Sequence, residues 1–338
     1  MTVACDVLPQ RSLRVGIVGT GFAAKRRAEA LRADSRAEVV AVAGHTPEST
    51  EAFARTQEIS TQLSWQALVA HKAIDLVTVC HANNSHAEVV RAALSLGKSV
   101  IVEYPLALSV AEAADLIDLA QRQRSLLHVE HIELLGGLHQ AMQAHLAKVG
   151  IPAYARYCTA SSRHPAPQKW AYRADLFGFP FMGALSRLHR FVNLFGAVRQ
   201  VSCQLQYNSV TSEPPEGYFR NCRCVAQIRF YAGVVAEVLY AKGEQTWRSQ
   251  RWMEVEGDRG ALVFNGDEGT FVGPDGTFPI EVTARRGLFA KDTTQVLDAL
   301  FEGTPLYVTP EASLYVMQVA AAAEQAAYTG QAITLPPP

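Results

Sequence analysis

The sequence predicts two domains: an α/β domain with a doubly wound parallel sheet, then an α+β domain with a large open, mostly antiparallel sheet. The chain has 338 residues, a usual length for two domains. Its first third alternates short apolar strands with amphipathic helices, the pattern of a parallel sheet covered by helices. After about residue 130 a run of alternating strands follows. We place the domains at residues 1–125 and 126–338. An alternative left open is that the last helices pack back on the first domain.

The expected strands of the first domain are rich in Val and Ile and are bounded by Gly, Asp, Asn or Pro, which favour turns. The helical stretches between them carry apolar residues on one side. The strands are Leu13–Val18, Glu38–Ala43, Asp75–Val79, Ser99–Val102 and Leu126–Glu130, and the helices are Ala24–Arg32, Pro47–Arg55, His86–Leu96 and Val110–Gln123.

The second domain begins with a helix near Gly137–Lys148 and continues with alternating strands. Turn signals at residues 231–233 and 274–276 separate several of these strands. The strands are Ala153–Ala160, Val201–Tyr207, Cys224–Phe230, Val234–Tyr240, Trp252–Glu256 and Ala261–Phe264; further helices are Gly183–Phe195, Asp292–Leu300 and Glu311–Tyr328.

The composition excludes several classes of protein. Hydrophobic residues make up 49% and the net charge is -1, so the chain is not a disordered one. The balanced charge provides no basic field for nucleic acid or an anionic membrane. No apolar run is long enough to span a membrane, and the first residues lack the pattern of a secretory signal. We therefore expect a cytoplasmic globular protein.

A glycine motif follows the first strand directly. Gly19, Gly21 and Ala24 fit G-x-G-x-x-A, preceded by Gly16 in the strand. The first glycine permits a tight turn, the second lets the backbone approach a pyrophosphate, and the small third residue lets helix and strand pack closely. An ordinary strand-to-helix turn is the alternative, but the surrounding strand and helix favour a dinucleotide-binding Rossmann site.

The end of the second strand indicates which dinucleotide binds. An NAD site usually has an acid there for the ribose diol, whereas this chain has His45 and Thr46 and no carboxylate before Glu48. Thr46 is positioned to donate to a 2′-phosphate, and the basic residues 25–27 lie just past the motif, either near that phosphate or on a solvated helix face. The expected cofactor is NADPH, with NADH use still possible.

Several motifs together resemble the Gfo/Idh/MocA oxidoreductases over essentially the whole chain. They are the glycine motif, Asn83–His86 after the third strand, and Gly97–Ala107 around the fourth. The resemblance implies that the cofactor contacts the glycine loop and the ends of the next strands. The residues expected there are Gly16, Gly19, Thr20, Gly21, Phe22, Ala23, His45, Thr46, His81, Asn83, His86 and Glu103, with His86 more of a packing or capping residue.

The chain departs from that family where sugar and polyol oxidation needs a base. Tyr104 takes the place of the family's lysine, and the places of its aspartate and histidine fall on Met182 and Ser186. Glu103-Tyr104-Pro105 instead resembles biliverdin reductases of the cyanobacterial type, a branch of the same superfamily. Further similar segments are Leu126–Gly137, Pro165–Trp170, Ala184–Arg187 and Arg285–Phe289.

This resemblance implies NAD(P)H-dependent reduction of biliverdin to bilirubin, with the hydride added at the central methine carbon. Glu103 and Tyr104 lie at the carboxyl end of a parallel strand, where doubly wound sheets bind ligands, and we expect both in the site. Glu103 would position nicotinamide or water, and Tyr104 would line the plane of the tetrapyrrole. His128, Glu130 and His131 do not have the helical spacing of a zinc site, so no metal is expected. His131 is either a substrate contact or a core imidazole.

The segment Gly183–Phe195 predicts a helix with an apolar stripe at Leu185, Leu188, Val192 and Phe195. Arg187 and Arg190 lie together on roughly the opposite side, either on a solvated face or in the site. Guanidinium groups bind carboxylates in pairs, and biliverdin carries two propionates. We expect Arg187 to be catalytic and Arg190 to bind substrate. Weaker candidates for propionate contact are Lys169, Arg285 and Arg286.

Two other functions remain open at this stage. One is a sugar or cyclitol dehydrogenase of the same superfamily, which Tyr104 argues against. The other is a non-catalytic NADPH-binding sensor, which the loss of the usual catalytic residues would allow. An exposed face of the second-domain sheet is a plausible surface for a homo-oligomer.

Overall fold

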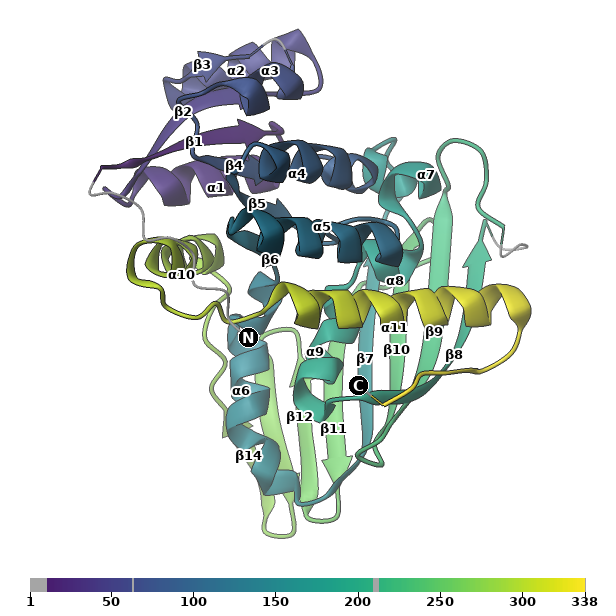
Figure 1. Ribbon diagram of the computed structural model, residues 1–338. Helices are drawn as coiled ribbons and strands as arrows, with labels where there is room; N and C mark the ends of the chain where they lie inside the picture. Colours follow the sequence, from purple (N-terminus) through teal and green to yellow (C-terminus); the bar gives the residue numbers. More distant parts are fainter. Residues whose placement is uncertain (1–10, 63, 209–212, 338) are drawn as a thin grey trace. The chain divides into compact units, whose positions relative to one another are not determined.

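The computed structural model describes residues 11–62, 64–208 and 213–337 (Figure 1). Contacts divide the chain into two units, the first formed by residues 1–132 with 287–314 and the second by residues 133–286 with 315–338. The first unit is thus larger than residues 1–125, because it includes the strand at residues 127–130 and a segment that returns from late in the chain.

The first unit contains a parallel sheet in the order β3-β2-β1-β4-β5-β6. In this doubly wound order the direction in which successive strands are added reverses between β1 and β4. The connections that leave the carboxyl ends of these two strands therefore run to opposite sides, and ligands bind in the crevice between them. The expected fold class of this domain is confirmed. The strands are β1 (Leu13–Val18), β2 (Ala37–Ala43), β3 (Ser60–Thr61), β4 (Leu76–Val79), β5 (Ser99–Glu103) and β6 (Leu127–Glu130).

Helices cover both faces of this sheet, because successive residues of a strand point to opposite sides. Ile17 belongs to the core that includes residues of α1 and α10, whereas a Cβ on the adjacent Gly16 would meet Leu68 of α3. The helices are α1 (Phe22–Arg32), α2 (Pro47–Gln57), α3 (Trp65–Ala70), η1 (Asn83–Ser85), α4 (His86–Ser95), α5 (Val110–Gln123), α10 (Leu288–Glu302) and the start of α11 (Pro310–Thr329).

The second unit is built on a nine-stranded sheet in the order β14-β13-β12-β11-β7-β10-β9-β8-β15. Only the β7–β10 pair is parallel among the named strands, so the expected mostly antiparallel sheet is confirmed. The strands are β7 (Pro152–Ser162), β8 (Val198–Tyr207), β9 (Asn221–Phe230), β10 (Val235–Gly243), β11 (Gln250–Gly257), β12 (Gly260–Asn265), β13 (Glu268–Gly273), β14 (Gly276–Ile280) and β15 (Ile333–Thr334).

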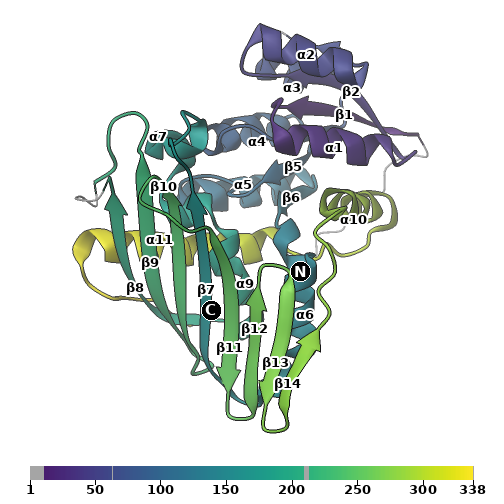
Figure 2. The same cartoon turned by 180° about the vertical axis from the view of Figure 1, so that it is seen from behind.

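Helices of the second unit lie over one face of this sheet, in front of it in Figure 1, and Figure 2 shows the opposite face. The alternating burial of β9 follows from this arrangement, since every second side chain points toward the helices. The helical segments are η2 (Ile132–Leu134), α6 (Gly137–His145), η3 (Leu146–Val149), η4 (Trp170–Tyr172), α7 (Ala174–Phe177), α8 (Pro180–Gly183), α9 (Ser186–Phe195) and the rest of α11.

The helix expected from Gly183 is interrupted. Gly183 ends α8, and a Cβ there would collide with Phe177. The burial of α9 also differs from the expected stripe, because Phe191 and Arg190 are buried while Val192 is only half-buried. Arg190 is not on a solvated face, and this correction bears directly on the site.

Candidate active site

The glycine loop has the geometry that a dinucleotide requires. Gly19 adopts a φ of 120°, and a Cβ there would collide with the carbonyl of Cys80, so only glycine fits. Nothing lies within 4 Å of a Cβ placed on Gly21, which leaves the backbone open to a pyrophosphate. No side chain caps the start of α1, so its first N–H groups can bind phosphate oxygens. This loop fits the expected cofactor.

The edge that selects the dinucleotide is exposed and carries no acid. His45 and Thr46 are both exposed, and the Thr46 hydroxyl caps α2 by accepting a hydrogen bond from the Ser49 amide at 3.3 Å. Arg27 is fully buried, so it is not a ligand for a 2′-phosphate, unlike the expectation from its place in the sequence. Lys25 and Arg26 are exposed on the same helix, and Arg26 is paired with Glu29 at 2.8 Å, so these two remain the available basic residues.

The loop after β4 brings two imidazoles together. His81 and His86 stack with ring centroids 5.3 Å apart, and His86 is bonded through Nδ1 to the Pro105 carbonyl at 2.8 Å. Burial lowers the pKa of His81 to about 3, so its ring is neutral at physiological pH. Both ring nitrogens of His81 are buried without a partner among the described residues. His86 therefore acts as the packing residue, and His81 has unused polar atoms beside the loop.

A buried ion network lies behind the glycine loop, and we call Arg27, Glu103, His128, Asp292 and Tyr307 the Arg27 network. Arg27 contacts Asp292 and, at 3.2 Å, Glu103. Asp292 also accepts from His128 at 2.8 Å and from the Tyr307 hydroxyl at 2.6 Å. Burial opposes ionisation of Asp292, but Arg27 and His128 outweigh it and hold its pKa well below the usual range. Glu103 is thus held at the end of β5 by the helix that starts at the glycine loop.

Tyr104 and His131 form a stacked pair in the first unit, with ring centroids 5.4 Å apart and planes within 6°. His131 is 1% exposed and is bonded through Nε2 to the Ser313 hydroxyl at 2.8 Å. Its burial supports the core-imidazole alternative over direct contact with substrate. Tyr104 is half-buried, and the peptide bond to Pro105 is cis.

The second unit gathers arginines around one carboxylate. Glu133 pairs with Arg190 and with Arg285. Burial opposes ionisation of Glu133, but Arg190, Arg285, Arg187 and Arg251 together keep its pKa lowered. We call these four arginines with Glu133 the arginine cluster.

Arg187 and Arg190 differ in exposure within this cluster. Arg187 is half-buried, donates to the Ser186 hydroxyl at 2.8 Å and has its guanidinium carbon 5.7 Å from the Tyr240 ring centre. Arg190 is 1% exposed, and its Nε and Nη1 have no partner among the described residues. Unpaired guanidinium N–H groups beside a surplus of positive charge are suited to a carboxylate ligand.

Sequence analysis did not identify three residues of this region as candidates for the site. Arg251 (β11) and Glu133 carried no motif, and Tyr157 is one aromatic residue in an ordinary strand pattern. Arg251 lies directly opposite Thr159 of β7, a pairing that only the register of β11 against β7 reveals. Of the weaker candidates, Arg285 joins the cluster, whereas Lys169 and Arg286 are exposed.

Lys242 of β10 lies beside the cluster among aromatic rings. Its ammonium is 3.9 Å from the Phe177 ring centre and 5.4 Å from that of Tyr240, and it donates to the Ala171 carbonyl. Burial lowers the pKa of Lys242 to about 7. Tyr240 is therefore contacted by two basic residues, Lys242 and Arg187.

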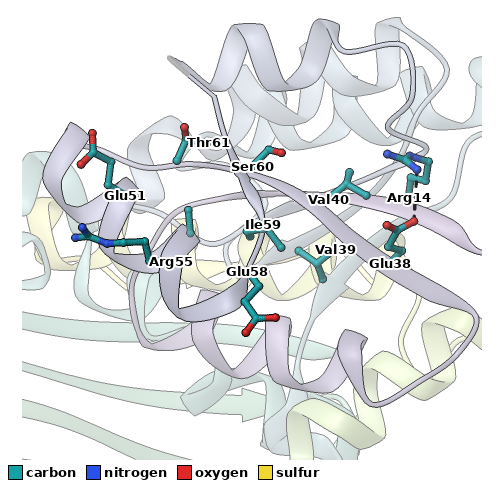
Figure 3. Close-up of a pocket in the computed structure, with 11 residues that line it drawn as sticks. Arg14, Glu38, Val39, Val40, Glu51, Arg55, Glu58, Ile59, Ser60 and Thr61 are labelled. Carbon is teal, nitrogen blue, oxygen red and sulfur yellow. Dashed lines mark hydrogen bonds and ion pairs between the residues drawn. The ribbon is translucent and has the colours of Figure 1, made fainter.

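An open pocket at the outer edge of the first sheet lies away from these residues (Figure 3). It is lined by Arg14, Glu38, Glu51, Arg55 and Glu58 among others, and none of the expected site residues contributes to it. Its side chains carry charges of both signs, Arg14 is paired with Glu38, and these features indicate no particular ligand.

Two observations limit the kinds of site in the described part of the chain. Among residues 11–62, 64–208 and 213–337, no group of three or more His, Cys, Asp or Glu side chains is arranged to hold a metal ion. Within the same residues, no helix is both long and apolar enough to cross a membrane.

The two domains and the glycine loop define an oxidoreductase. The chain belongs to the Gfo/Idh/MocA oxidoreductase family: the model of its NAD-binding Rossmann fold matches residues 13–131, and that of its C-terminal alpha/beta domain matches residues 148–335.

Within this family the chain is similar to biliverdin reductases. The crystal structure of biliverdin reductase from Synechocystis sp. PCC 6803, in complex with biliverdin and NADP+, is 47% identical with a TM-score of 0.89, covering 93% of this chain and 98% of that one. The resemblance seen in residues 103–105 is thereby confirmed.

Curated relatives are more distant. Biliverdin reductase A of Mus musculus is 29% identical over 198 residues, which is 59% of this chain and 63% of the relative's length. A dTDP-3,4-didehydro-2,6-dideoxy-alpha-D-glucose 3-reductase of Saccharopolyspora spinosa is 31% identical over 171 residues, 50% of this chain and 52% of that protein. These matches thus span less than two thirds of each relative.

Proposed function

We propose that this protein reduces biliverdin to bilirubin, using NADPH as the hydride donor and the central methine carbon as the acceptor. The observation that carries the proposal is the arginine cluster, in which Glu133 pairs with Arg190 and Arg285 while Arg187 and Arg251 add positive charge nearby. A surplus of cations at a half-buried site requires an anionic ligand, and biliverdin has two propionates. The likeness to the Synechocystis enzyme supports the same substrate.

The first unit supplies the residues that would hold the cofactor. The glycine loop and the free start of α1 would bind the pyrophosphate. His45 and Thr46 at the end of β2, with Lys25 on α1, would receive the 2′-phosphate, because no acid repels it there. The bound nicotinamide supplies the hydride. Glu103, fixed by Arg27, would orient the nicotinamide or a water molecule.

Arg187 would act on the electron-rich tetrapyrrole. Hydride arrival adds electron density to the conjugated system, and a fixed cation lowers the free energy of that charge build-up. Arg187 is held by Ser186 and Thr159, so its charge is in place before the reaction. Arg190 and Arg285, both bonded to Glu133, would bind or orient propionates.

The residues needed for alcohol oxidation argue against the sugar dehydrogenase alternative. Tyr104 replaces the lysine expected there, and Met182 and Ser186, at the places of the aspartate and histidine, are each 2% exposed. Neither a buried methionine nor a buried serine is a base of suitable pKa. The chain thus has no obvious group in those places to take a hydroxyl proton.

A spectroscopic assay tests the function. Purified protein is mixed with NADPH and biliverdin, and absorbance is followed for loss of the biliverdin band and growth of bilirubin. We expect turnover by the wild type, and a kcat lowered by about 10²–10³-fold in Arg187→Ala while NADPH still binds. Unchanged biliverdin together with NADP+ reduction by a polyol would favour the dehydrogenase, and NADPH binding without turnover of either substrate would favour the sensor.

Two further features of the proposal concern assembly and location. The face of the nine-stranded sheet seen in Figure 2 includes the exposed Val225 of β9, and a homo-oligomer through this face would be detected by light scattering. The five described cysteines are free thiols, which supports a reducing cytoplasmic location, testable by fractionation of the source cells.

A further inference from the structure

Tyr157 of β7 lies inside the arginine cluster, although neither its spacing nor a motif distinguishes it. Its side chain is 3% exposed. The ring packs edge-on against Phe191, with centroids 6.3 Å apart, and the Arg190 guanidinium carbon is 5.7 Å from the ring centre. Thr159, two positions along the same face of β7, accepts from Arg187 at 3.4 Å. The phenol is therefore on the strand face that carries Arg187.

The hydroxyl of Tyr157 makes no hydrogen bond to any residue in the described ranges. It is also not among the fully buried polar atoms without a partner, so the hydroxyl itself reaches solvent although the side chain as a whole is 3% exposed. The Phe191 ring and the Arg190 guanidinium fix the phenol in place, and its donor is left for a bound molecule or water. This unused donor stands beside the cations that we assign to the anionic substrate.

We propose that Tyr157 donates the proton that reduction of the tetrapyrrole requires. The proposal rests on the proposed function and adds a proton source to it. NADPH gives a hydride to the central methine carbon and becomes NADP+. The O–H bond of Tyr157 breaks, an N–H bond forms on a pyrrole nitrogen, and the phenolate is then reprotonated by water. The sum is biliverdin, NADPH and one proton giving bilirubin and NADP+.

The charged surroundings suit a phenol acid better than they suit an arginine acid. Burial raises the pKa of Tyr157, but Arg190, Arg187 and Arg251 outweigh burial and Glu133, so that its pKa is lowered overall. Arginine stays protonated at any ordinary pH, and Arg187 is therefore a poor source of a proton. The same three arginines stabilise the phenolate left after transfer.

The first test removes only the hydroxyl. Tyr157→Phe keeps the ring contacts with Phe191 and Arg190 and is expected to lower kcat by at least about 10²-fold, the usual effect of losing a general acid, with little change in the KM for NADPH. The matched control is Tyr154→Phe on the opposite face of the same strand, where the hydroxyl donates to Glu237 at 3.0 Å. This control is expected to keep wild-type kcat.

The second test uses pH. A proton donor must be protonated, so wild-type kcat should fall as pH rises through the pKa of Tyr157, below the usual value of 10.0. Removal of one neighbouring cation by Arg251→Gln should raise that pKa and move the fall to higher pH. Tyr157→Phe should lack the fall. A structural role of Tyr157 would change none of these profiles.

The third test does not depend on activity. Ultraviolet titration of the protein without ligands reports phenolate formation, and the wild-type curve minus the Tyr157→Phe curve should show one phenol that ionises early. Burial and Glu237 raise the pKa of Tyr154 to about 12. The wild-type curve minus the Tyr154→Phe curve should therefore show one phenol that ionises late. The proposal fails if no early phenol is lost in Tyr157→Phe, or if that variant keeps more than half of kcat. A wild-type protein inert toward biliverdin overturns the proposed function instead.

Discussion

Two regions of the molecule bury arginines, and they balance the charge differently. In the Arg27 network, Arg27 pairs with two carboxylates, those of Glu103 and Asp292. His128 and Tyr307 form further hydrogen bonds to the Asp292 carboxylate. In the arginine cluster, Arg190 and Arg285 share Glu133, Arg187 and Arg251 lie near it, and Arg190 retains two unpaired nitrogens among the described residues.

The difference separates a structural role from a binding role. A buried charge that is paired and hydrogen-bonded holds elements together, as Arg27 does for α1, β5 and α10. A buried charge without enough partners raises the free energy of the protein alone, and a ligand of opposite charge relieves that cost. We therefore expect substitutions in the Arg27 network to act on stability and substitutions in the arginine cluster to act on turnover.

The largest expected effect is on stability. Arg27→Met leaves Asp292 buried without its main partner and should lower the free energy of unfolding by about 3–5 kcal/mol, measured by chemical denaturation. Arg26→Met is the control, because Arg26 is an exposed residue paired with Glu29, and should change stability by less than about 1 kcal/mol. Equal losses in the two variants would remove the distinction between the regions.

In the arginine cluster, Arg187→Ala should lower kcat by about 10²–10³-fold, because a preorganised cation is lost at the reacting system. NADPH affinity and the free energy of unfolding should change little. Arg187→Lys keeps the charge but loses the planar fork and should also be much impaired. Steady-state kinetics decide the role: an effect confined to the KM for biliverdin would make Arg187 a propionate clamp.

The Arg27 network should also give stability a dependence on acid. The folded-state pKa of Asp292 is depressed below its usual 3.8, so the stabilisation is present above that value and is lost as pH falls below it. The difference in unfolding free energy between wild type and Asp292→Asn should thus shrink in acid. A difference that stays constant down to low pH would mean that the carboxylate is not stabilised by its partners.

A smaller effect is expected at the end of β2, where His45 and Thr46 are expected to select the dinucleotide and no carboxylate is present. Thr46→Asp places a carboxylate near the expected 2′-phosphate and should raise the KM for NADPH at least about tenfold, after screening at this exposed site, while NADH use improves. Thr46→Asn, which adds no charge, is the control. Equal use of both cofactors by the wild type would contradict this assignment.

Tyr104→Phe should have the smallest effect. The ring that stacks on His131 remains in this variant, so the packing beside the expected site is kept. We expect most of the kcat to be retained in steady-state assays. A fall of about 10³-fold would make Tyr104 the proton donor and would exclude Tyr157 from that role.

Local patterns predicted the type of each sheet and the glycine loop, because period-2 and helical apolar patterns and the turn at Gly19 depend on neighbouring residues. These patterns failed where contacts with residues distant in the sequence determine whether an element forms. The β13–β14 hairpin was missed because Glu268–Gly273 contains two glycines and few β-branched residues, and its pairing with β12 supplies the stability.

The site followed the same division. Arg187 and Glu103 were predicted as site residues because they lie in recognisable segments. The burial of Arg190 depends on Glu133, which is 57 residues away, and that of Arg27 on Asp292, which is 265 residues away. Periodicity cannot show that a distant carboxylate neutralises a charge, so neither burial could be predicted.

The segment that returns to the first unit has a consequence for synthesis of the chain. Val296, Leu297 and Leu300 of α10 belong to the same core as β1 and α1, and Asp292 is the partner of Arg27. A ribosome that has made only residues 1–132 has therefore produced a nucleotide-binding sheet with one core face uncovered and with Arg27 lacking one of its two carboxylate partners. The first unit to begin folding is among the last to finish, and until then an exposed apolar face is open to chaperones or to other chains.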